Sequence, residues 1–149
     1  MDIADFLTPD RIVLDAKLRD KSQFVTETAR LFASLDPALQ PASVETALRA
    51  RERLGSTGLG GGFALPHARI EGLEEYAGLF LRLAKPIDFD AIDGKPIDLA
   101  FVLLIPFETT TPHVAALAAI SRKFRDAALA AKLRKIGTQA AAYEALTAE

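Results

Sequence analysis

The feature that most constrains the fold of this chain is a run of glycines near its middle. Between Gly55 and Gly62, five of the eight residues are glycine. Glycine readily adopts left-handed conformations and loses more backbone entropy on ordering than any other residue. We therefore expect an irregular loop here, without a regular helix or strand. Its exposed backbone amides are expected to approach a ligand closely and to form a concave binding site for an anion.

Hydrophobic patterns outside this loop predict three strands. Residues 99–105 form a continuous apolar run, typical of a strand that is buried on both faces of a sheet. Residues 76–84 alternate and are expected to form a strand that ends at Lys85-Pro86, with a hairpin-type turn at Asp93-Gly94. A short strand is expected at residues 12–14.

Candidate capping residues predict where the helices begin. Apolar residues at helical spacing follow Ser22 and Ser43, which indicates one helix from Ser22 to Leu35 and a second after Ser43. Thr111-Pro112 predicts a third start, with proline at the first helical position, and Gly137 separates a last helix, Thr138–Thr147. The fold predicted for residues 1–149 is a single α/β domain with a central mixed β-sheet flanked by helices on both faces.

Composition excludes several functional classes. The formal net charge of −2 offers no general attraction for nucleic acid or anionic lipid. The absence of cysteine rules out disulfides and thiolate chemistry. The N-terminal residues lack the basic and apolar segments of a signal peptide, and no apolar run is long enough to cross a bilayer. We therefore expect a cytoplasmic protein without membrane insertion or nucleic-acid binding.

The only two histidines of the chain, His67 and His113, both lie where an anion could be handled. Imidazole titrates near neutral pH and serves as nucleophile, acid or base. Pro66 stiffens the backbone before His67. If Thr111 caps a helix, His113 is its second residue, where unpaired amides and the helix dipole favour an anion and a neutral ring. The alternative is that each is an ordinary polar residue of the surface or core.

Other common catalytic motifs are missing. The glycine-rich segment does not end in the Gly-Lys-Ser/Thr of a P-loop, which argues against direct use of ATP. The sequence contains no cluster with metal-ligand spacing and no nucleophile-elbow motif. We therefore expect no metal and no cofactor.

Residues 51–67 read RERLGSTGLGGGFALPH, which resembles the active-site signature of the IIA components of the bacterial phosphoenolpyruvate:sugar phosphotransferase system (PTS). The resemblance is to the fructose/mannitol type (EIIA type-2) and most to its nitrogen-regulatory branch, EIIA-Ntr (PtsN). It extends from about Leu7 to the C-terminus and implies the same three-layer α/β fold. Members often carry Asn where Gly61 stands, and a left-handed backbone at that position suits both residues.

The resemblance also implies roles for individual residues. It makes His67 the phosphorylated residue (phosphohistidine) and His113 a supporting one. It assigns phosphoryl stabilisation to Arg51, although Arg49 and Arg53 are rivals in the same neighbourhood. The hydroxyl groups of Ser56 and Thr57 are candidates for phosphate binding but are equally suited to capping local turns.

The function that the resemblance implies is that of a phosphocarrier. It would accept a phosphoryl group from the carrier HPr, or its nitrogen-branch paralogue NPr, onto His67, and regulatory protein partners would read its phosphorylation state. The alternative is a sugar-specific EIIA that passes phosphate to an EIIB domain for fructose- or mannitol-type uptake. A third is a binding module that has kept the fold and lost phosphotransfer.

Overall fold

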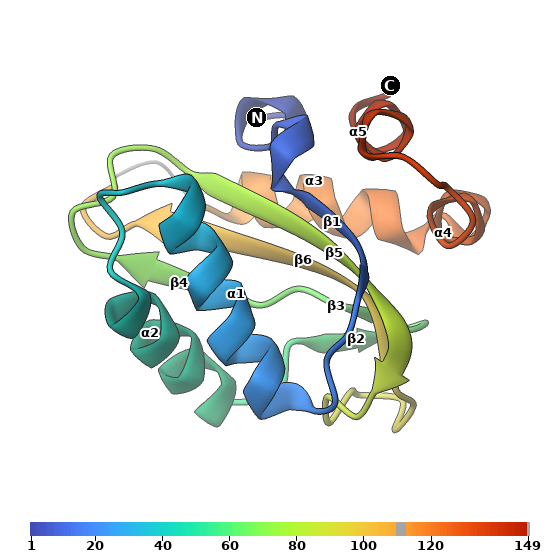
Figure 1. Ribbon diagram of the computed structural model, residues 1–149, viewed down its shortest axis with the longest axis horizontal. Coiled ribbons are helices and arrows are strands. Elements are labelled where there is room, and N and C mark those ends of the chain that lie inside the picture. Colours follow the sequence, from blue (N-terminus) through green and yellow to red (C-terminus); the bar gives the residue numbers. More distant parts are fainter. Residues whose placement is uncertain (110–112, 149) are drawn as a thin grey trace.

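A mixed six-stranded β-sheet crosses the centre of the molecule (Figure 1). The computed structural model describes residues 1–109 and 113–148. The strand order is β1-β5-β6-β3-β2, and β4 also pairs with β6. The strands are β1 (Ile12–Ala16), β2 (Gly58–Gly60), β3 (Phe63–Ala64), β4 (His67–Ile70), β5 (Ala77–Ile87) and β6 (Ile97–Pro106). β6 runs antiparallel to β5 and parallel to both β3 and β4.

Helices cover both faces of this sheet (Figure 1). The described residues form five α-helices and two short 3₁₀-helices: α1 (Lys21–Leu35), α2 (Pro41–Arg53), α3 (Val114–Arg125), α4 (Ala127–Leu133), α5 (Gln139–Thr147), η1 (Ile3–Asp5) and η2 (Pro9–Arg11). One core packs α1 and α2 against the sheet, and the other packs the three C-terminal helices against the opposite face. The predicted α/β fold with a covered mixed sheet is confirmed.

Strand β6 lies between the two cores. Ala100 and Val102 pack toward α1 and α2, whereas Leu99 and Phe101 pack toward the C-terminal helices. All four side chains are fully buried. Alternate residues of a strand point to opposite faces, so a strand covered on both sides must be apolar throughout. The expectation of a doubly buried strand is confirmed.

Several predicted boundaries are wrong. Helix α1 is capped by Asp20, whose carboxylate accepts from the Gln23 amide at 2.8 Å, and α2 follows Gln40 with Pro41 in its first turn. Neither Ser22 nor Ser43 is therefore a cap. Strand β5 does not alternate and does not end at Lys85-Pro86. Its pairing with β6 shifts register between Arg82 and Ile87, and proline is tolerated at such irregularities.

The glycine-rich segment is more regular than expected. Strand β2 pairs with β3 in an antiparallel hairpin, so the prediction that this segment forms no regular element is wrong. Gly60, Gly61 and Gly62 have φ angles of +93°, +66° and +79° and make its turn. The glycines thus supply the positive φ angles of a tight turn and leave the flanking backbone free to pair.

The C-terminal region differs in one detail that concerns His113. Thr111 and Pro112, the predicted helix start, lie outside the described residues. His113 occupies the N-cap of α3, one position before the helix, and is not its second residue. The last helix was predicted correctly, with Thr138 as its cap. Helix α4, which Asp126 caps by accepting from the Ala128 and Leu129 amides, was not foreseen as a separate helix.

Candidate functional site

His67 is the first residue of β4, and it follows a break in the strand pairing along β6. β3 and β4 pair one after the other with β6, and Leu65 and Pro66 separate them. Proline has no N–H to donate, which explains the gap in the pairing. The Pro66 carbonyl still accepts from the Leu103 amide at 3.0 Å. The imidazole is thus presented from a backbone fixed on both sides of the proline.

The orientation of the His67 ring follows from one hydrogen bond. Its Nδ1 atom lies 2.8 Å from the Leu65 carbonyl oxygen. A carbonyl oxygen only accepts, so Nδ1 must carry the hydrogen, and in the neutral ring Nε2 keeps its lone pair. Among residues 1–109 and 113–148, no group hydrogen-bonds to Nε2. The lone pair of this half-buried ring is therefore on Nε2, the nitrogen without a hydrogen-bond partner among these residues.

The surroundings of His67 disfavour its protonated form. Burial lowers the pKa of His67 most, and the positive charges of Arg51 and of protonated His113 lower it further. The hydrogen bond to Leu65 and the negative charge of Glu52 act in the opposite direction, but the net pKa shift is downward. The ring is therefore neutral over a wider pH range than a free histidine, which keeps the Nε2 lone pair available.

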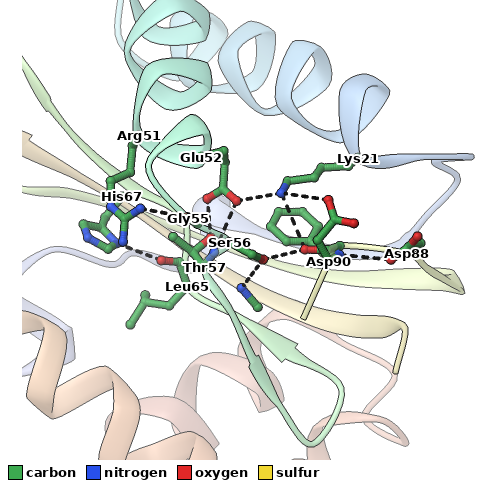
Figure 2. A network of polar contacts seen from close by, with 12 residues as sticks. Lys21, Arg51, Glu52, Gly55, Ser56, Thr57, Leu65, His67, Asp88 and Asp90 are labelled. Atoms are coloured by element: carbon green, nitrogen blue, oxygen red, sulfur yellow. Dashed lines mark hydrogen bonds and ion pairs between the residues drawn. The ribbon is translucent and has the colours of Figure 1, made fainter. Parts of the chain in front are cut away.

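Arg51 lies in the last turn of α2 and reaches the same place. Its Nη1 atom donates to the Gly55 carbonyl at 2.9 Å, and Figure 2 shows the guanidinium beside the His67 ring. The rival Arg49 is engaged between α1 and α2, where it pairs with Glu45 and donates to Thr26. Arg53 is exposed. Arg51 is thus the arginine of this helix end that the structure brings to His67.

His113 also approaches His67, although the two are far apart in sequence. It is half-buried at the N-cap of α3, and its charge influences the pKa of His67. The two histidines and Arg51 thus come from three different elements, β4, α3 and α2. Their convergence gives the lone-pair nitrogen of His67 two cationic or hydrogen-bond-donating neighbours, an arrangement that could hold an anion.

Ser56 and Thr57 bind within the protein. The Ser56 hydroxyl donates to the Phe89 carbonyl at 2.5 Å and accepts from the Gly58 amide at 3.0 Å. The Thr57 hydroxyl donates to Glu52, and the residue is only 2% exposed. Both hydroxyl hydrogens are therefore donated within the protein. Binding of phosphate by these groups stays a prediction, and it would require these hydrogen bonds to break.

Sequence reasoning missed the role of Glu52. Its side chain is only 8% exposed and lies 2.9 Å from Lys21 Nζ. It also accepts from the Thr57 amide at 3.2 Å and from the Thr57 hydroxyl (Figure 2). One signal was available: a carboxylate in the last turn of a helix is unfavourable beside the negative end of the helix dipole, so its presence there indicates a specific partner.

The tip of the glycine-rich hairpin is held by charged residues. The Gly61 amide donates to Asp93 at 3.1 Å, and its carbonyl accepts from Arg134 at 2.9 Å. Arg134 also forms a two-point contact with Asp98, with distances of 2.8 and 2.9 Å. Gly61 has a left-handed backbone, and a Cβ atom there would meet open space. This geometry would suit an asparagine as well as a glycine.

Residues 1–109 and 113–148 contain no group of three or more His, Cys, Asp or Glu side chains able to hold a metal ion. Over the same residues, no helix has the length and apolar character needed to cross a bilayer.

Comparison with known proteins identifies the class to which this fold and site correspond. Residues 5–149 match the family described as "Phosphoenolpyruvate-dependent sugar phosphotransferase system, EIIA 2". The chain therefore belongs to this EIIA family.

Individual relatives point to one branch of that family. The chain is 41% identical over 146 residues to a nitrogen regulatory protein of Bradyrhizobium diazoefficiens, covering 98% of this chain and 95% of the relative. It is similar to the crystal structure of nitrogen regulatory protein IIA-Ntr from Neisseria meningitidis, with 36% identity, a TM-score of 0.90 and coverage of 97% and 99%. IIA mannitol from Escherichia coli shares the fold at 17% identity, with a TM-score of 0.77 and coverage of 94% and 98%.

Proposed function

We propose that this protein is a histidine phosphocarrier in which His67 Nε2 accepts a phosphoryl group from the phosphohistidine of HPr or NPr. One observation supports this most directly. The Nδ1 hydrogen bond to the Leu65 carbonyl fixes the neutral tautomer that leaves Nε2 as a lone-pair donor. Phosphoryl transfer needs little from the acceptor beyond such a positioned nucleophile and stabilisation of the transferred charge.

The transfer balances without an added cofactor. The Nε2 lone pair of His67 forms a bond to phosphorus while the nitrogen–phosphorus bond of the donor breaks, and that electron pair returns to the donor imidazole. The acceptor ring gains positive character, which its Nδ1–H shares with the Leu65 carbonyl. We infer that Arg51 and His113, whose charges both act on His67, hold the phosphoryl oxygens. The planar guanidinium of Arg51 favours a two-point contact. The reverse steps pass the group onward.

The regulatory role is the second part of the proposal. We infer that the phosphorylation state is read by regulatory protein partners, that residues 1–149 act as one EIIA domain, and that the protein works in the cytoplasm. The nitrogen-regulatory names of relatives at 36–41% identity support this. The sugar-specific alternative, with transfer to an EIIB domain, has weaker support, because the mannitol-type structure is only 17% identical and shows the fold alone.

The test is a reconstituted transfer assay. Purified protein is incubated with labelled phosphoenolpyruvate, the first enzyme of the phosphotransferase system, and either HPr or NPr. We expect acid-labile label on the wild type and none on His67→Ala, with the folding of that variant checked by circular dichroism. Undiminished labelling of His67→Ala would overturn the assignment. A clear preference for NPr over HPr supports the regulatory branch, whereas rapid onward transfer to a sugar-specific EIIB favours the alternative.

A further inference from the structure

A continuous series of hydrogen bonds leads from the buried carboxylate of Glu52 to the ring of His67. Glu52 accepts from both the amide and the hydroxyl of Thr57. The Thr57 carbonyl accepts from the Leu65 amide at 2.9 Å, and the Leu65 carbonyl accepts from His67 Nδ1 at 2.8 Å. The first two steps join α2 to the start of the glycine-rich hairpin, and that start to the residues before β4 (Figure 2). The last step lies within the segment from Leu65 to His67.

We propose that Glu52 is a positioning residue, which orients His67 through Thr57 and Leu65 and does not itself touch the phosphoryl group. This inference rests on the proposed function for its catalytic consequence, although the positioning itself is a property of the unphosphorylated protein. It adds a residue to the site formed by His67, His113 and Arg51.

Two adjacent residues of α2, Arg51 and Glu52, make different contacts. Side chains at neighbouring helical positions point about 100° apart, because the helix has 3.6 residues per turn. Arg51 faces the His67 ring and donates to the Gly55 carbonyl. Glu52 faces inward and accepts from Thr57, which lies two residues after Gly55. The short connection from α2 to β2 is therefore fixed at two points, and the same helix end places both the phosphoryl-binding arginine and the backbone that orients the nucleophile.

The burial of Glu52 is stabilised by Lys21 at the start of α1. Lys21 Nζ lies 2.9 Å from Glu52 and 3.6 Å from Asp90, and it stacks over the Phe89 ring at 4.7 Å. A carboxylate that is 8% exposed needs such partners, because burying an unpaired charge is costly. With Lys21 and two Thr57 donors present, Glu52 is held rigidly enough to act as an anchor.

Loss of the Glu52 carboxylate is expected to leave the orientation of the His67 ring less well fixed. The Leu65 peptide groups would no longer be held through Thr57, and the Nδ1 hydrogen bond would be made part of the time. The Nε2-protonated tautomer, which has no lone pair on Nε2 for attack, would then become populated. Removing outer partners that orient metal-bound histidines lowers affinity or activity by about 10–100-fold. A reduction of that order is expected here, mainly in kcat because ring orientation acts on the transfer step.

The experiment measures the ring directly. The protein has only two histidines, so ¹⁵N-detected long-range spectra give two sets of imidazole signals that report tautomer and pKa. Wild-type His67 is expected in the Nδ1–H form. Glu52→Ala should move it toward a mixture of tautomers and reduce kcat. Thr57→Val, which keeps the amide donor but loses the hydroxyl, should give a smaller shift of the same kind, and Thr57→Ser should restore wild-type behaviour.

Glu52→Gln separates charge from geometry and serves if Glu52→Ala does not fold. The amide oxygen still accepts from Thr57, so the tautomer is retained, whereas the pKa of His67 falls because a nearby negative charge is lost. Glu45→Gln is the matched control: it removes a carboxylate on the same helix that pairs with Arg49, away from the hairpin. It should change neither readout.

The outcomes distinguish this inference from the proposed function. A wild-type tautomer of His67 in both Glu52→Ala and Thr57→Val would overturn the positioning role, even if His67 is phosphorylated. If Glu52→Ala does not fold, a wild-type tautomer in Thr57→Val decides the question, and a changed pKa in Glu52→Gln alone would show only the effect of charge. If instead the tautomer shifts as expected but no phosphocarrier labels His67, the proposed function fails and the positioning role stands. The spectroscopic measurement needs no phosphoryl donor, so it is decisive in either case.

Discussion

The imidazole of His67 is hydrogen-bonded to the carbonyl of Leu65, two residues earlier, across Pro66. The ring therefore takes its orientation from its own chain, and the Leu-Pro-His sequence carries most of the local geometry. Pro66 restricts the backbone on both sides, so the carbonyl and the ring meet without a large loss of conformational freedom. What the local sequence cannot supply is the charge environment, which comes from α2 and α3.

This environment predicts an unusual pH profile. The pKa of His67 is lowered by burial and by the charges of Arg51 and His113, against the opposing effect of Glu52. We therefore expect the rate of phosphorylation to stay constant as pH falls through about 6.5, the ordinary imidazole pKa, and to decline only at lower pH. The measurement is the single-turnover rate from phospho-HPr between pH 8 and 5, corrected for titration of the donor. A decline centred at the ordinary pKa would contradict the lowered value.

The same shift makes a prediction about stability. A histidine whose folded-state pKa lies below its unfolded value binds fewer protons in the folded state. The free energy of unfolding therefore decreases as pH falls from about 6.5 toward the folded pKa. Above that window the group has no effect. The free energy of unfolding of His67→Gln, relative to wild type, should therefore improve on acidification through this window. Denaturant titrations at several pH values test this, and a difference that does not depend on pH would contradict it.

The fold was largely predictable because its strongest signals are local. The apolar run of β6 and the spacing of α1 and α5 follow directly from the periodicity of buried faces. The errors have both local and tertiary causes. Asp20 occupies the N-cap that Ser22 was expected to hold. Strand β5 continues through Pro86 because a register shift in its pairing with β6 accommodates the proline. Strand β2 exists because the backbone of β3 is beside it, which composition alone does not reveal.

The site was predictable only as far as the motif extends. His67, His113 and Arg51 were singled out from the sequence, and the structure brings them together, but their roles stay predictions. Glu52 escaped notice because its importance depends on Lys21, which lies on another helix and carries no motif. Its position in the last turn of α2 signals that it has a partner, but a single sequence does not show which distant residue that partner is.

Arg51 is expected to stabilise the phosphorylated state more than the free one. Hydrogen bonds to charged groups contribute about 1.5–3 kcal/mol, and partial exposure reduces this, so Arg51→Ala should lower the phosphorylation equilibrium constant about tenfold. Arg51→Lys should recover only part of the loss, because an ammonium lacks the planar two-point contact. The measurement is the phosphorylated fraction at a fixed ratio of phospho-HPr to HPr.

Two controls accompany this measurement. Arg49→Ala removes a cation that is engaged between α1 and α2, and Arg53→Ala removes an exposed one. Equal effects of all three substitutions would show that only long-range charge matters. Thermal unfolding of unphosphorylated Arg51→Ala is also needed, because this variant loses the bond to the Gly55 carbonyl.

His113 is expected to act on the rate of transfer. Removing one positioned donor at a site of charge development commonly costs about 10²–10³ in rate, so His113→Ala should still be phosphorylated on His67 but slowly. The reverse reaction should also slow, because both directions share one transition state, and it should slow to the same extent where the substitution leaves the phosphorylation equilibrium unchanged. Rapid-quench kinetics in both directions test this, and wild-type rates in both would remove His113 from the mechanism.

The glycine turn gives a prediction that separates two adjacent positions. Gly61 and Gly62 both have positive φ angles, but their surroundings differ. A Cβ atom at Gly62 would lie 2.6 Å from Arg134 Nη2 and 2.9 Å from Asp98 Oδ1, whereas one at Gly61 would meet nothing within 4 Å. Gly62→Ala must therefore disturb Arg134, which joins the end of α4 to Asp98 of β6 and to the Gly61 carbonyl of the hairpin. A backbone cost of about 1–2 kcal/mol is added to this.

For a domain of about 150 residues, 1 kcal/mol corresponds to roughly 2–4 °C in Tm. Gly62→Ala is expected to lower Tm by at least several degrees, and Gly61→Asn, which suits a left-handed backbone, by much less. Arg134→Ala in the Gly62→Ala background checks the cause. It removes the clashing guanidinium, so the two substitutions should cost less together than the sum of their separate effects. Strict additivity would show that backbone strain alone explains the loss and that the hairpin is not coupled to α4 through Arg134.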